Sequence, residues 1–520
     1  MTRRSAALLA ATLTVATLAA VPSLTTPSPV AAAVAAPARV SVTKDCIDSV
    51  PEPGESAPVK ICYSIYKPGP ASPKRPVPMI MHSHGWAGER ATKKEISAFT
   101  AAGYGVLSFD QRGFGISEGF AHVENPDFEG VDVRKLVVLI SKLPWVQQDG
   151  PGDPRLGAVG GSYGGGYQFL GAFEELRLQG KPIFDALAPQ ITWNDLEGSL
   201  APEGVVRTEW ALALSAAALP SNALPPYIYK GLVEGAVQGT FPDGAEPGTE
   251  NLSAFFEKNG PAYHVKNGRK LDIPVLFGQG TTDGLFPLEQ GLTNWRTAIT
   301  PRARKQSIFV GYNGGHVLPA VFPQGVNVTS DPCSKALGSK DFEQLSIRFF
   351  DEVLRGRDRN LTGFNRIHLA TAGSDCISVK SVKAAQKVDL GSVGNLTAVS
   401  APIPVEIAAG PITVAGTPYL TGAVTALGVQ NRMFLGLGVG ASPLDARLVQ
   451  NNVLPLSEPM PVSGAARRVD LPSVAVKVPK GQFLYLIVSP ISDTFVGMGS
   501  RTPGAILIDN TVVHLPVVRR

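Results

Sequence analysis

Apolar and polar positions follow two different patterns along the chain, and the change falls near residue 360. Between about residues 60 and 357, short apolar runs such as VPMIMHSHG (77–85) and YGVLSFDQRG (104–113) alternate with segments of helical spacing. An apolar run of this length is typical of a buried strand, whereas a helix repeats its apolar positions every three or four residues. The alternation predicts an α/β fold, with a doubly wound parallel sheet covered by helices on both faces.

Three further strands and two amphipathic helices follow from the same patterns. We expect the strands at 156–162, 273–280 and 305–315, and the helices at 128–143 and 341–356.

The alternation is interrupted between residues 193 and 270. This segment contains Ala-rich helical text (RTEWALALSAAAL), pairs of prolines and the loop FPDGAEPGTE. Because it separates two expected strands of one sheet, we interpret it as a helical cap inserted over the sheet edge. The α/β domain would then comprise residues 40–192 and 271–360.

From residue 361 to 520 the helical signals fade. Runs such as RIHLATAG, QFLYLIVSP and AILIDNTVVHLPVV alternate between apolar and other residues and are separated by Gly and Pro. Several short strands of this kind predict an all-β sandwich or jelly roll.

The first 35 residues have the pattern of a signal peptide followed by a spacer. Arg3 and Arg4 precede an apolar Ala/Leu run, and small residues follow it. The run is shorter than the roughly 20 residues that a membrane span needs, so we expect a secreted mature chain without a span. The formal net charge is only +4, with no basic cluster, so the composition gives no indication of nucleic-acid binding.

The sequence contains four cysteines, Cys46, Cys62, Cys333 and Cys376. An even number in an exported chain favours disulfides, and the nearest pairing is Cys46–Cys62 with Cys333–Cys376. Four unpaired buried thiols are the alternative. None of the cysteines has the spacing of a metal site, and we expect neither a metal nor a cofactor.

The pattern G-x-S-x-G occurs twice, at Ser117 (GISEG) and at Ser162 (GGSYG). A nucleophile elbow needs a strand before the serine and a helix after it, because the sharp turn between them exposes the hydroxyl. LGAVG precedes Ser162 as a strand, and apolar residues at helical spacing follow it. Ser117 follows a loop and precedes AHVENPDF, which contains a proline. We therefore predict Ser162 as the nucleophile; a tight turn with an idle serine is the alternative.

A serine nucleophile needs a base, and the base needs an acid that orients it. In this type of fold the order along the chain is serine, acid, histidine. Asp283 follows the strand IPVLFGQG, and His316 lies in the glycine-rich exit GYNGGH of the next strand. These positions predict Asp283 as the acid and His316 as the base, against the plainer interpretation of both as turn residues.

The oxyanion of an acyl-transfer intermediate needs two hydrogen-bond donors. We expect the backbone N–H groups of Tyr163, next to the serine, and Trp86, in the loop after an early strand. Trp193 and Trp210 in the cap are candidates for lining the substrate pocket, although both are also suited to packing the cap.

Several stretches resemble α/β-hydrolases of the X-Pro dipeptidyl-peptidase and cocaine-esterase-like group. DQRGFGISEG resembles the D-x-R-G-x-G-x-S-x-G segment of that group, GGSYGG its elbow, and GTTDGLFP and GGH its acid and base loops. The resemblance implies a helical cap and a C-terminal jelly roll. Members of the group often use a tyrosine side chain as an oxyanion donor, whereas this chain has HSHGWAG, without a tyrosine.

Together these features predict an exported serine hydrolase that cleaves a small ester or a short peptide through an acyl-enzyme. Carboxylesterase-like action is the leading interpretation and X-Pro dipeptidyl-peptidase action the alternative. For the latter, Asp195, Glu197, Glu203 and Glu209 are candidates for holding a substrate amine. A non-catalytic binding protein on the same fold is the interpretation of another class.

Overall fold

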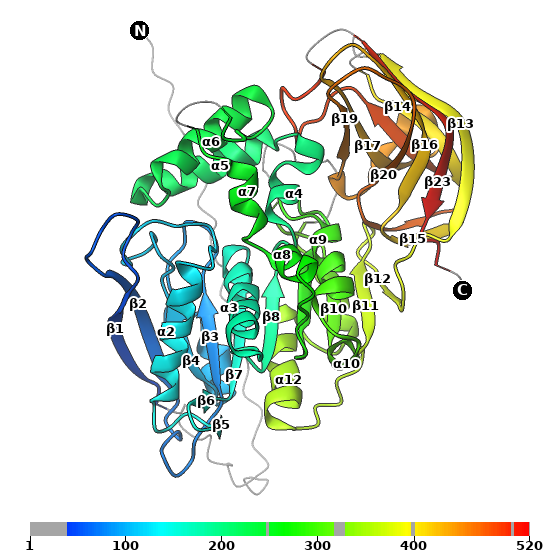
Figure 1. The fold of residues 1–520 in the computed structure, drawn as a ribbon. Helices are drawn as coiled ribbons and strands as arrows, with labels where there is room; N and C mark the ends of the chain where they lie inside the picture. The colour runs from blue at the N-terminus through cyan, green and yellow to red at the C-terminus, as the bar shows by residue number, and fades with distance from the viewer. Residues whose placement is uncertain (1–38, 246–248, 317–327, 397–400, 501–503, 519–520) are drawn as a thin grey trace, which may run out of the picture. The chain divides into compact units, whose positions relative to one another are not determined.

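The computed structural model describes residues 39–518 except 246–248, 317–327, 397–400 and 501–503 (Figure 1). The expected signal peptide and spacer, residues 1–35, lie outside the described residues.

A ten-stranded sheet forms the framework of the first part of the chain, in the order β1-β2-β4-β3-β7-β8-β9-β10-β11-β12. Strands β4 to β11 of this order are parallel, and antiparallel pairs flank them at both edges. The strands are β1 (Ser41–Ser49), β2 (Val59–Lys67), β3 (Met79–Ser83), β4 (Gly105–Phe109), β7 (Leu156–Gly161), β8 (Ala186–Gln190), β9 (Leu276–Gly280), β10 (Ile308–Tyr312), β11 (Arg366–Ala370) and β12 (Cys376–Val379). A short pair, β5 (Gln148–Gly150) with β6 (Asp153–Pro154), lies outside this sheet.

Helices cover both faces of this sheet, as predicted. Met79 and Met81 of β3 belong to a core formed with α2 (Glu129–Ser141) and α3 (Tyr163–Gln179), whereas Ile80 belongs to a core formed with α1 (Ser97–Ala101) and α12 (Phe342–Arg355). Successive side chains of a strand point to opposite faces, so an uninterrupted apolar strand supplies both cores. Figure 1 shows α2 and α3 side by side.

Helices also fill the segment between β8 and β9. These inserted helices are α4 (Leu196–Leu200), α5 (Thr208–Ala218), α6 (Pro226–Gln238), α7 (Leu252–Glu257) and α8 (Pro261–Lys266). They are followed, after β9, by α9 (Leu288–Thr293), α10 (Pro301–Lys305) and α11 (Pro332–Ala336). Short 3₁₀ or π turns occur at η1 (Pro202–Gly204), η2 (Leu219–Ser221), η3 (Asn294–Ala298), η5 (Pro443–Asp445) and η6 (Val449–Asn451).

The C-terminal part is an antiparallel β-sandwich with its own apolar core. Its strands are β13 (Gln386–Leu396), β14 (Ile403–Ala409), β15 (Ile412–Gly416), β16 (Tyr419–Leu427), β17 (Asn431–Gly440), β18 (Arg447–Leu448), β19 (Leu454–Glu458), β20 (Val462–Asp470), β21 (Val474–Val478), β22 (Phe483–Ser489) and β23 (Ala505–Leu515).

One stretch lies in a different sheet from the one we expected. The pattern of RIHLATAG predicts a strand of the sandwich, but residues 366–370 form β11, which pairs in parallel with β10 of the large sheet. An apolar strand at the edge of either sheet has the same pattern, so periodicity alone does not distinguish the two.

Two disulfides join the cysteines in the expected pairs. Cys46–Cys62 links β1 to β2 across directly paired positions, with Cα atoms 3.9 Å apart. Cys333–Cys376 links α11 to β12, with Cα atoms 5.0 Å apart.

No helix in the described parts of the chain combines the length and the apolar character needed to cross a membrane.

Candidate active site

Ser162 lies in a sharp turn between strand β7 and helix α3. Its backbone has φ 57° and ψ −121°, a strained conformation for a residue with a side chain. β7 ends at Gly161 and α3 begins at Tyr163, so Ser162 is the single residue between them. This is the strand–turn–helix context in which a serine hydroxyl stands at the edge of the sheet.

The glycines on either side are required by close backbone contacts. A Cβ atom at Gly160 would lie 2.4 Å from the carbonyl oxygen of Gly164, and one at Gly164 would lie 2.4 Å from that of Ser83. Real Cβ atoms do not approach oxygen this closely, so the turn can form only with glycine at these positions.

His316 and Asp283 meet Ser162 from two other loops. Nε2 of His316 lies 2.8 Å from Oγ of Ser162, and Nδ1 of His316 lies 2.8 Å from Oδ2 of Asp283. His316 follows β10, and Asp283 follows β9. Because both strands are parallel to β7 in one sheet, their carboxyl ends meet at the same edge.

Hydrogen bonds hold the acid loop in place. Oδ1 of Asp283 accepts from the backbone N–H groups of Leu285 and Phe286, both at 2.9 Å, and the side chain is fully buried. The hydroxyl of Thr282 is hydrogen-bonded to Gly314 of the histidine loop. These bonds leave Oδ2 of Asp283 aimed at the imidazole.

The sandwich contributes a further bond to this loop. Nδ2 of Asn452 donates to the carbonyl oxygen of Thr281 at 3.2 Å, and Asn452 is buried. Sequence patterns gave no signal for this contact, because 171 residues separate the two positions.

The backbone N–H groups of Tyr163 and Trp86 are the predicted oxyanion donors. Tyr163 is the first residue of α3, where the N–H groups have no acceptor within the helix and the helix dipole favours negative charge. The N–H of Trp86 has no acceptor among the described residues. The preceding Gly85 lies beside Ser162, since a Cβ there would be 3.6 Å from the Cβ of Ser162.

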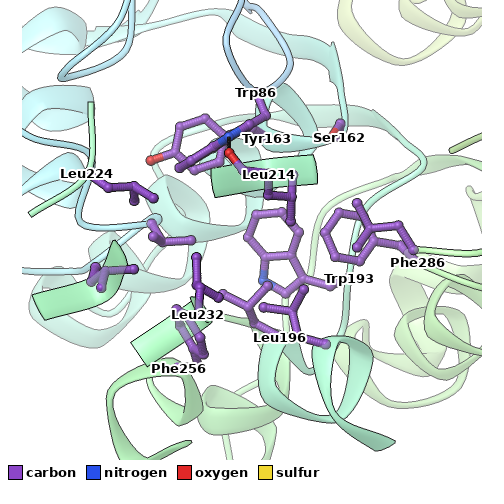
Figure 2. Close-up of a pocket in the computed structure, with 14 residues that line it drawn as sticks. Trp86, Ser162, Tyr163, Trp193, Leu196, Leu214, Leu224, Leu232, Phe256 and Phe286 are labelled. Atoms are coloured by element: carbon purple, nitrogen blue, oxygen red, sulfur yellow. Dashed lines mark hydrogen bonds between the residues drawn. The ribbon is translucent and has the colours of Figure 1, made fainter. Parts of the chain in front are cut away.

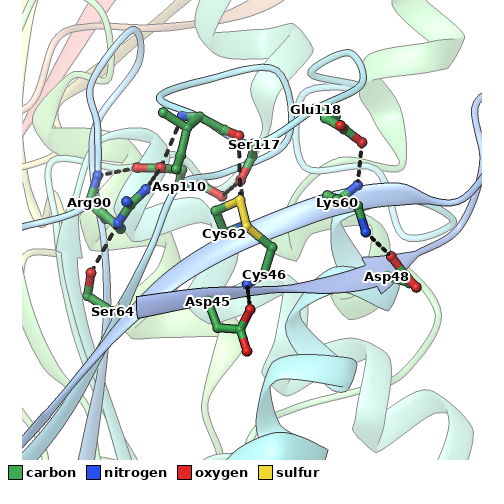
Figure 3. Close-up of a disulfide and its surroundings, with 11 residues drawn as sticks. Asp45, Cys46, Asp48, Lys60, Cys62, Ser64, Arg90, Asp110, Ser117 and Glu118 are labelled. Carbon is green, nitrogen blue, oxygen red and sulfur yellow. Dashed lines mark hydrogen bonds and ion pairs between the residues drawn. A yellow bond between two sulfur atoms is a disulfide. The ribbon is translucent and has the colours of Figure 1, made fainter. Parts of the chain in front are cut away.

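Ser117, the serine of the other G-x-S-x-G pattern, has a structural role. Oγ of Ser117 donates to the carbonyl oxygen of Asp110 and accepts from the N–H of Cys62, both at 2.8 Å (Figure 3). Cys62 forms the disulfide to Cys46, and the carboxylate of Asp110 pairs with Arg90. Ser117 therefore fastens its loop to strand β2.

Buried charges hold the same loop from the other side. The guanidinium of Arg112 is fully buried and donates to Asp132 at 2.9 and 3.0 Å and to Glu52 at 3.0 Å. Glu52 also accepts from the N–H of Phe120 at 2.9 Å and contacts Nε2 of His122 at 2.7 Å. The D-x-R-G-x-G-x-S-x-G segment is thus a structural loop built around Arg112.

A cavity opens beside Ser162 beneath the inserted helices (Figure 2). Ser162, Tyr163 and Trp193 line it, together with apolar side chains from α4, α5, α6 and α7 and with Leu285 and Phe286 of the acid loop. Sequence analysis missed these apolar residues except Trp193, because an amphipathic cap helix does not reveal which of its inner residues face a cavity. Trp86 also lines the cavity, and its indole N–H donates to the carbonyl oxygen of Leu214 in α5 at 3.0 Å.

The two tryptophans chosen from the sequence have different positions. Trp193 lines the cavity, and its indole N–H donates to the carbonyl oxygen of Asn259. Trp210 is not among the residues that line it; its ring meets His316 edge-on, with centroids 5.9 Å apart. Its place beside the histidine results from the path of α5 over the loops, which no sequence pattern indicated.

The model of the X-Pro dipeptidyl-peptidase family, S15, matches residues 57–317, which is half of the chain. The chain belongs to this S15 family. It is therefore a hydrolase of the serine type, and the matched region includes the elbow, the acid loop and His316. The earlier resemblance to the X-Pro dipeptidyl-peptidase and cocaine-esterase-like group is confirmed.

Two solved structures share the fold of this S15 member. An aminopeptidase from a Thaumarchaeota archaeon aligns with a TM-score of 0.62 at 13% identity, covering 92% of this chain and 96% of that one. An α-amino acid ester hydrolase aligns with a TM-score of 0.58 at 14% identity, covering 95% of this chain and 100% of that one. At such identities the likeness concerns the fold, including the C-terminal sandwich.

A curated relative matches a shorter stretch. An uncharacterised Escherichia coli protein from the traX-finO intergenic region is 33% identical over 105 residues, which cover 20% of this chain and 35% of that protein. The chain thus spans about a third of the length of this relative.

Proposed function

We propose that this S15 member is an acyl hydrolase that cleaves esters through a covalent acyl-enzyme on Ser162. The proposal rests above all on the continuous contact from Asp283 through His316 to Ser162, with both hydrogen-bond distances at 2.8 Å. A serine hydroxyl is a weak nucleophile without such a base.

In the proposed reaction, Oγ of Ser162 attacks the ester carbonyl while Nε2 of His316 takes the hydroxyl proton. The carbonyl electrons move to oxygen, where the N–H groups of Tyr163 and Trp86 donate to the negative charge. When the tetrahedral intermediate collapses, His316 returns the proton to the leaving alcohol. Water then attacks the acyl-enzyme by the same steps, and Asp283 stabilises the imidazolium each time it forms.

X-Pro dipeptidyl-peptidase action is the second candidate, because the family carries that name. It requires an anionic group for the substrate amine. Of the carboxylates proposed for this purpose, Asp195 caps α4 and Glu197 accepts from Ser253 at 3.4 Å, while Glu203 is exposed. Neither these three nor Glu209 lines the cavity beside Ser162, which favours the ester reaction.

Labelling by a fluorophosphonate probe tests the proposed nucleophile. We expect covalent labelling of the wild type and none of Ser162→Ala, with Ser117→Ala as the matched control that keeps its label. Labelling that disappears in folded Ser117→Ala but persists in Ser162→Ala would place the nucleophile at the other serine. An unlabelled wild type would favour a non-catalytic binding protein.

We also propose that the chain is exported. The two disulfides form in oxidising compartments, in agreement with the signal-peptide pattern of residues 1–35. N-terminal sequencing of the protein recovered from the culture medium tests the proposal: a mature chain beginning near residue 36 is expected, and retention of residues 1–35 in a cytoplasmic protein would contradict it.

A further inference from the structure

The cavity beside Ser162 is almost free of polar groups. Apart from Ser162 itself, the tyrosine hydroxyl and the tryptophan indoles, its walls are aliphatic and aromatic. Trp193, Leu196, Leu285 and Phe286 are among these lining residues. Figure 2 shows Leu232 and Phe256 across the cavity from Ser162.

We infer that this cavity is the binding site for a short, uncharged aliphatic acyl group of about four or five carbons, and that it rejects acyl groups bearing an amine. The inference rests on the proposed acyl-enzyme chemistry of Ser162 and names its substrate class. This substrate class excludes X-Pro dipeptides, because their free amine would have to be held near the reacting carbonyl.

The walls offer no counter-charge to an ammonium group. A charge that leaves water without a partner is strongly disfavoured. Glu124 follows the lining residue Val123, but its side chain lies against Gly166 and does not line the cavity. The other acidic residues next to lining residues, Asp195, Glu197 and Glu257, do not line it either. Burial, with the neighbouring carboxylates of Glu129 and Asp132, raises the pKa of Glu124 well above its usual range, which disfavours the charged form of this carboxyl.

The size of the cavity limits the chain length. The space open to the centre of a water-sized sphere is about 40 Å³, and a cavity needs roughly 10–15 Å³ to hold a single water molecule. A space this small suits a short chain, which we take as about three or four methylene groups beyond the carbonyl carbon. A butyryl or pentanoyl group fills this space, an acetyl group leaves most of it empty, and an octanoyl group exceeds it.

Leu232 of α6 is the position that tests this limit. Its side chain lines the cavity and is 4% exposed, whereas the next residue, Val233, is 46% exposed and points outward from the same helix. Shortening Leu232 lengthens the cavity, and enlarging it shortens the cavity. The same change at Val233 leaves the cavity as it is, which makes it a matched control.

The experiment compares kcat/KM for p-nitrophenyl acetate, butyrate, hexanoate and octanoate. For the wild type we expect an increase of about fourfold per methylene from acetate to butyrate, from the free energy of burying each methylene, and a decrease at octanoate. Leu232→Ala should move the maximum to hexanoate or octanoate, and Leu232→Trp should move it to acetate. Val233→Ala should leave it unchanged.

A matched pair of substrates tests the charge. Methyl butyrate and methyl 2-aminobutyrate differ only in the amine, and we expect at least a hundredfold lower kcat/KM for the amino ester. Equal use of the two esters, or hydrolysis of alanyl-prolyl p-nitroanilide that is lost in Glu124→Gln, would overturn the inference and identify Glu124 as an amine anchor.

Labelling of Ser162 distinguishes a failure of the proposed function from a failure of the acyl-site proposal alone. Absence of fluorophosphonate labelling and of all ester hydrolysis in the wild type would refute the proposed function itself. A labelled, active enzyme whose length profile is the same in wild type and Leu232→Ala would refute only the acyl site. If Leu232→Ala does not fold, Leu232→Val removes a single methylene and should still raise the hexanoate to butyrate ratio; an unchanged ratio would count against the inference.

Discussion

The two G-x-S-x-G turns of this chain have the same pentapeptide pattern and opposite surroundings. Ser162 has a positive φ and is followed at once by a helix, and its Oγ contacts a histidine. Ser117 has no positive φ, and both of its hydrogen bonds go to backbone groups of β2 and of the loop after β4. The pentapeptide pattern alone therefore does not identify a nucleophile. The strand before it and the helix after it determine whether the hydroxyl faces a base.

Substitution of the serines provides the strongest test of this contrast. If Ser162, His316 and Asp283 act as one unit, Ser162→Ala should lower kcat by roughly a millionfold, as in other serine hydrolases. The double variant Ser162→Ala/His316→Ala should be little worse than the single one, because the base has nothing left to activate. Steady-state and burst kinetics on butyrate esters measure the loss of kcat in the single and double variants. Losses that multiply in the double variant would show that the two residues act independently.

Removal of the disulfide beside Ser117 should lower the free energy of unfolding and leave the reactivity of Ser162 unchanged. Cys46→Ser/Cys62→Ser opens a loop of sequence separation 16, for which chain entropy predicts a loss of about 3 kcal/mol in the free energy of unfolding. Urea denaturation measures the loss, and fluorophosphonate labelling per folded molecule should stay constant. The pair Cys333→Ser/Cys376→Ser, on a different loop, is the control. Loss of labelling in the folded Cys46→Ser/Cys62→Ser variant would mean that the Ser117 loop influences the reaction directly.

Ser117→Ala should show the reverse of Ser162→Ala. It leaves the N–H of Cys62 without its acceptor, at a cost of roughly 1–3 kcal/mol for a buried donor, while kcat/KM remains close to that of the wild type. Ser162→Ala removes no structural bond to the backbone and should keep its melting temperature. A common effect of both substitutions on stability and on activity would remove the distinction between the two turns.

Acid should destabilise the packing around the Ser117 loop, and this is the smallest expected effect. Burial tends to raise the pKa of Glu52, but hydrogen bonds from His122, the Phe120 N–H and Arg112 outweigh it and hold this pKa below 4.5. A lowered folded-state pKa gives stability that is present above the unfolded value and is lost as pH falls below about 4.5. The free energy of unfolding, measured from pH 6 to pH 3, should decrease less steeply in Glu52→Gln. Equal slopes would show that Glu52 is not the linked group.

Sequence patterns predicted most of the sheet because each central strand is an uninterrupted apolar run. Helix α12, expected at 341–356, forms at Phe342–Arg355 with Asp341 accepting from the N–H of Gln344 as its N-cap. The loops carrying Ser162, Asp283 and His316 also followed from the order of strands, since the carboxyl ends of parallel strands share one edge. That these three side chains act in catalysis remains a prediction.

Other features depended on contacts between distant segments. Strand β8, Ala186–Gln190, is short and contains a proline, so its pattern gave no separate signal. Trp193 and Trp210 are equally apolar and lie in the same inserted segment, yet one lines the cavity and the other meets His316. Periodicity identifies the buried side of a helix and not the neighbour that it meets.

The bond from Asn452 to the acid loop has a consequence for the order of events during synthesis. His316 leaves the ribosome 136 residues before Asn452 does, by subtraction of the two positions. At about 5–20 residues per second, this is a delay of roughly 7–27 seconds. During that interval the three loops of the candidate site are already made, but the carbonyl of Thr281 still lacks its partner. The acid loop is therefore completed late, by a residue of the C-terminal sandwich.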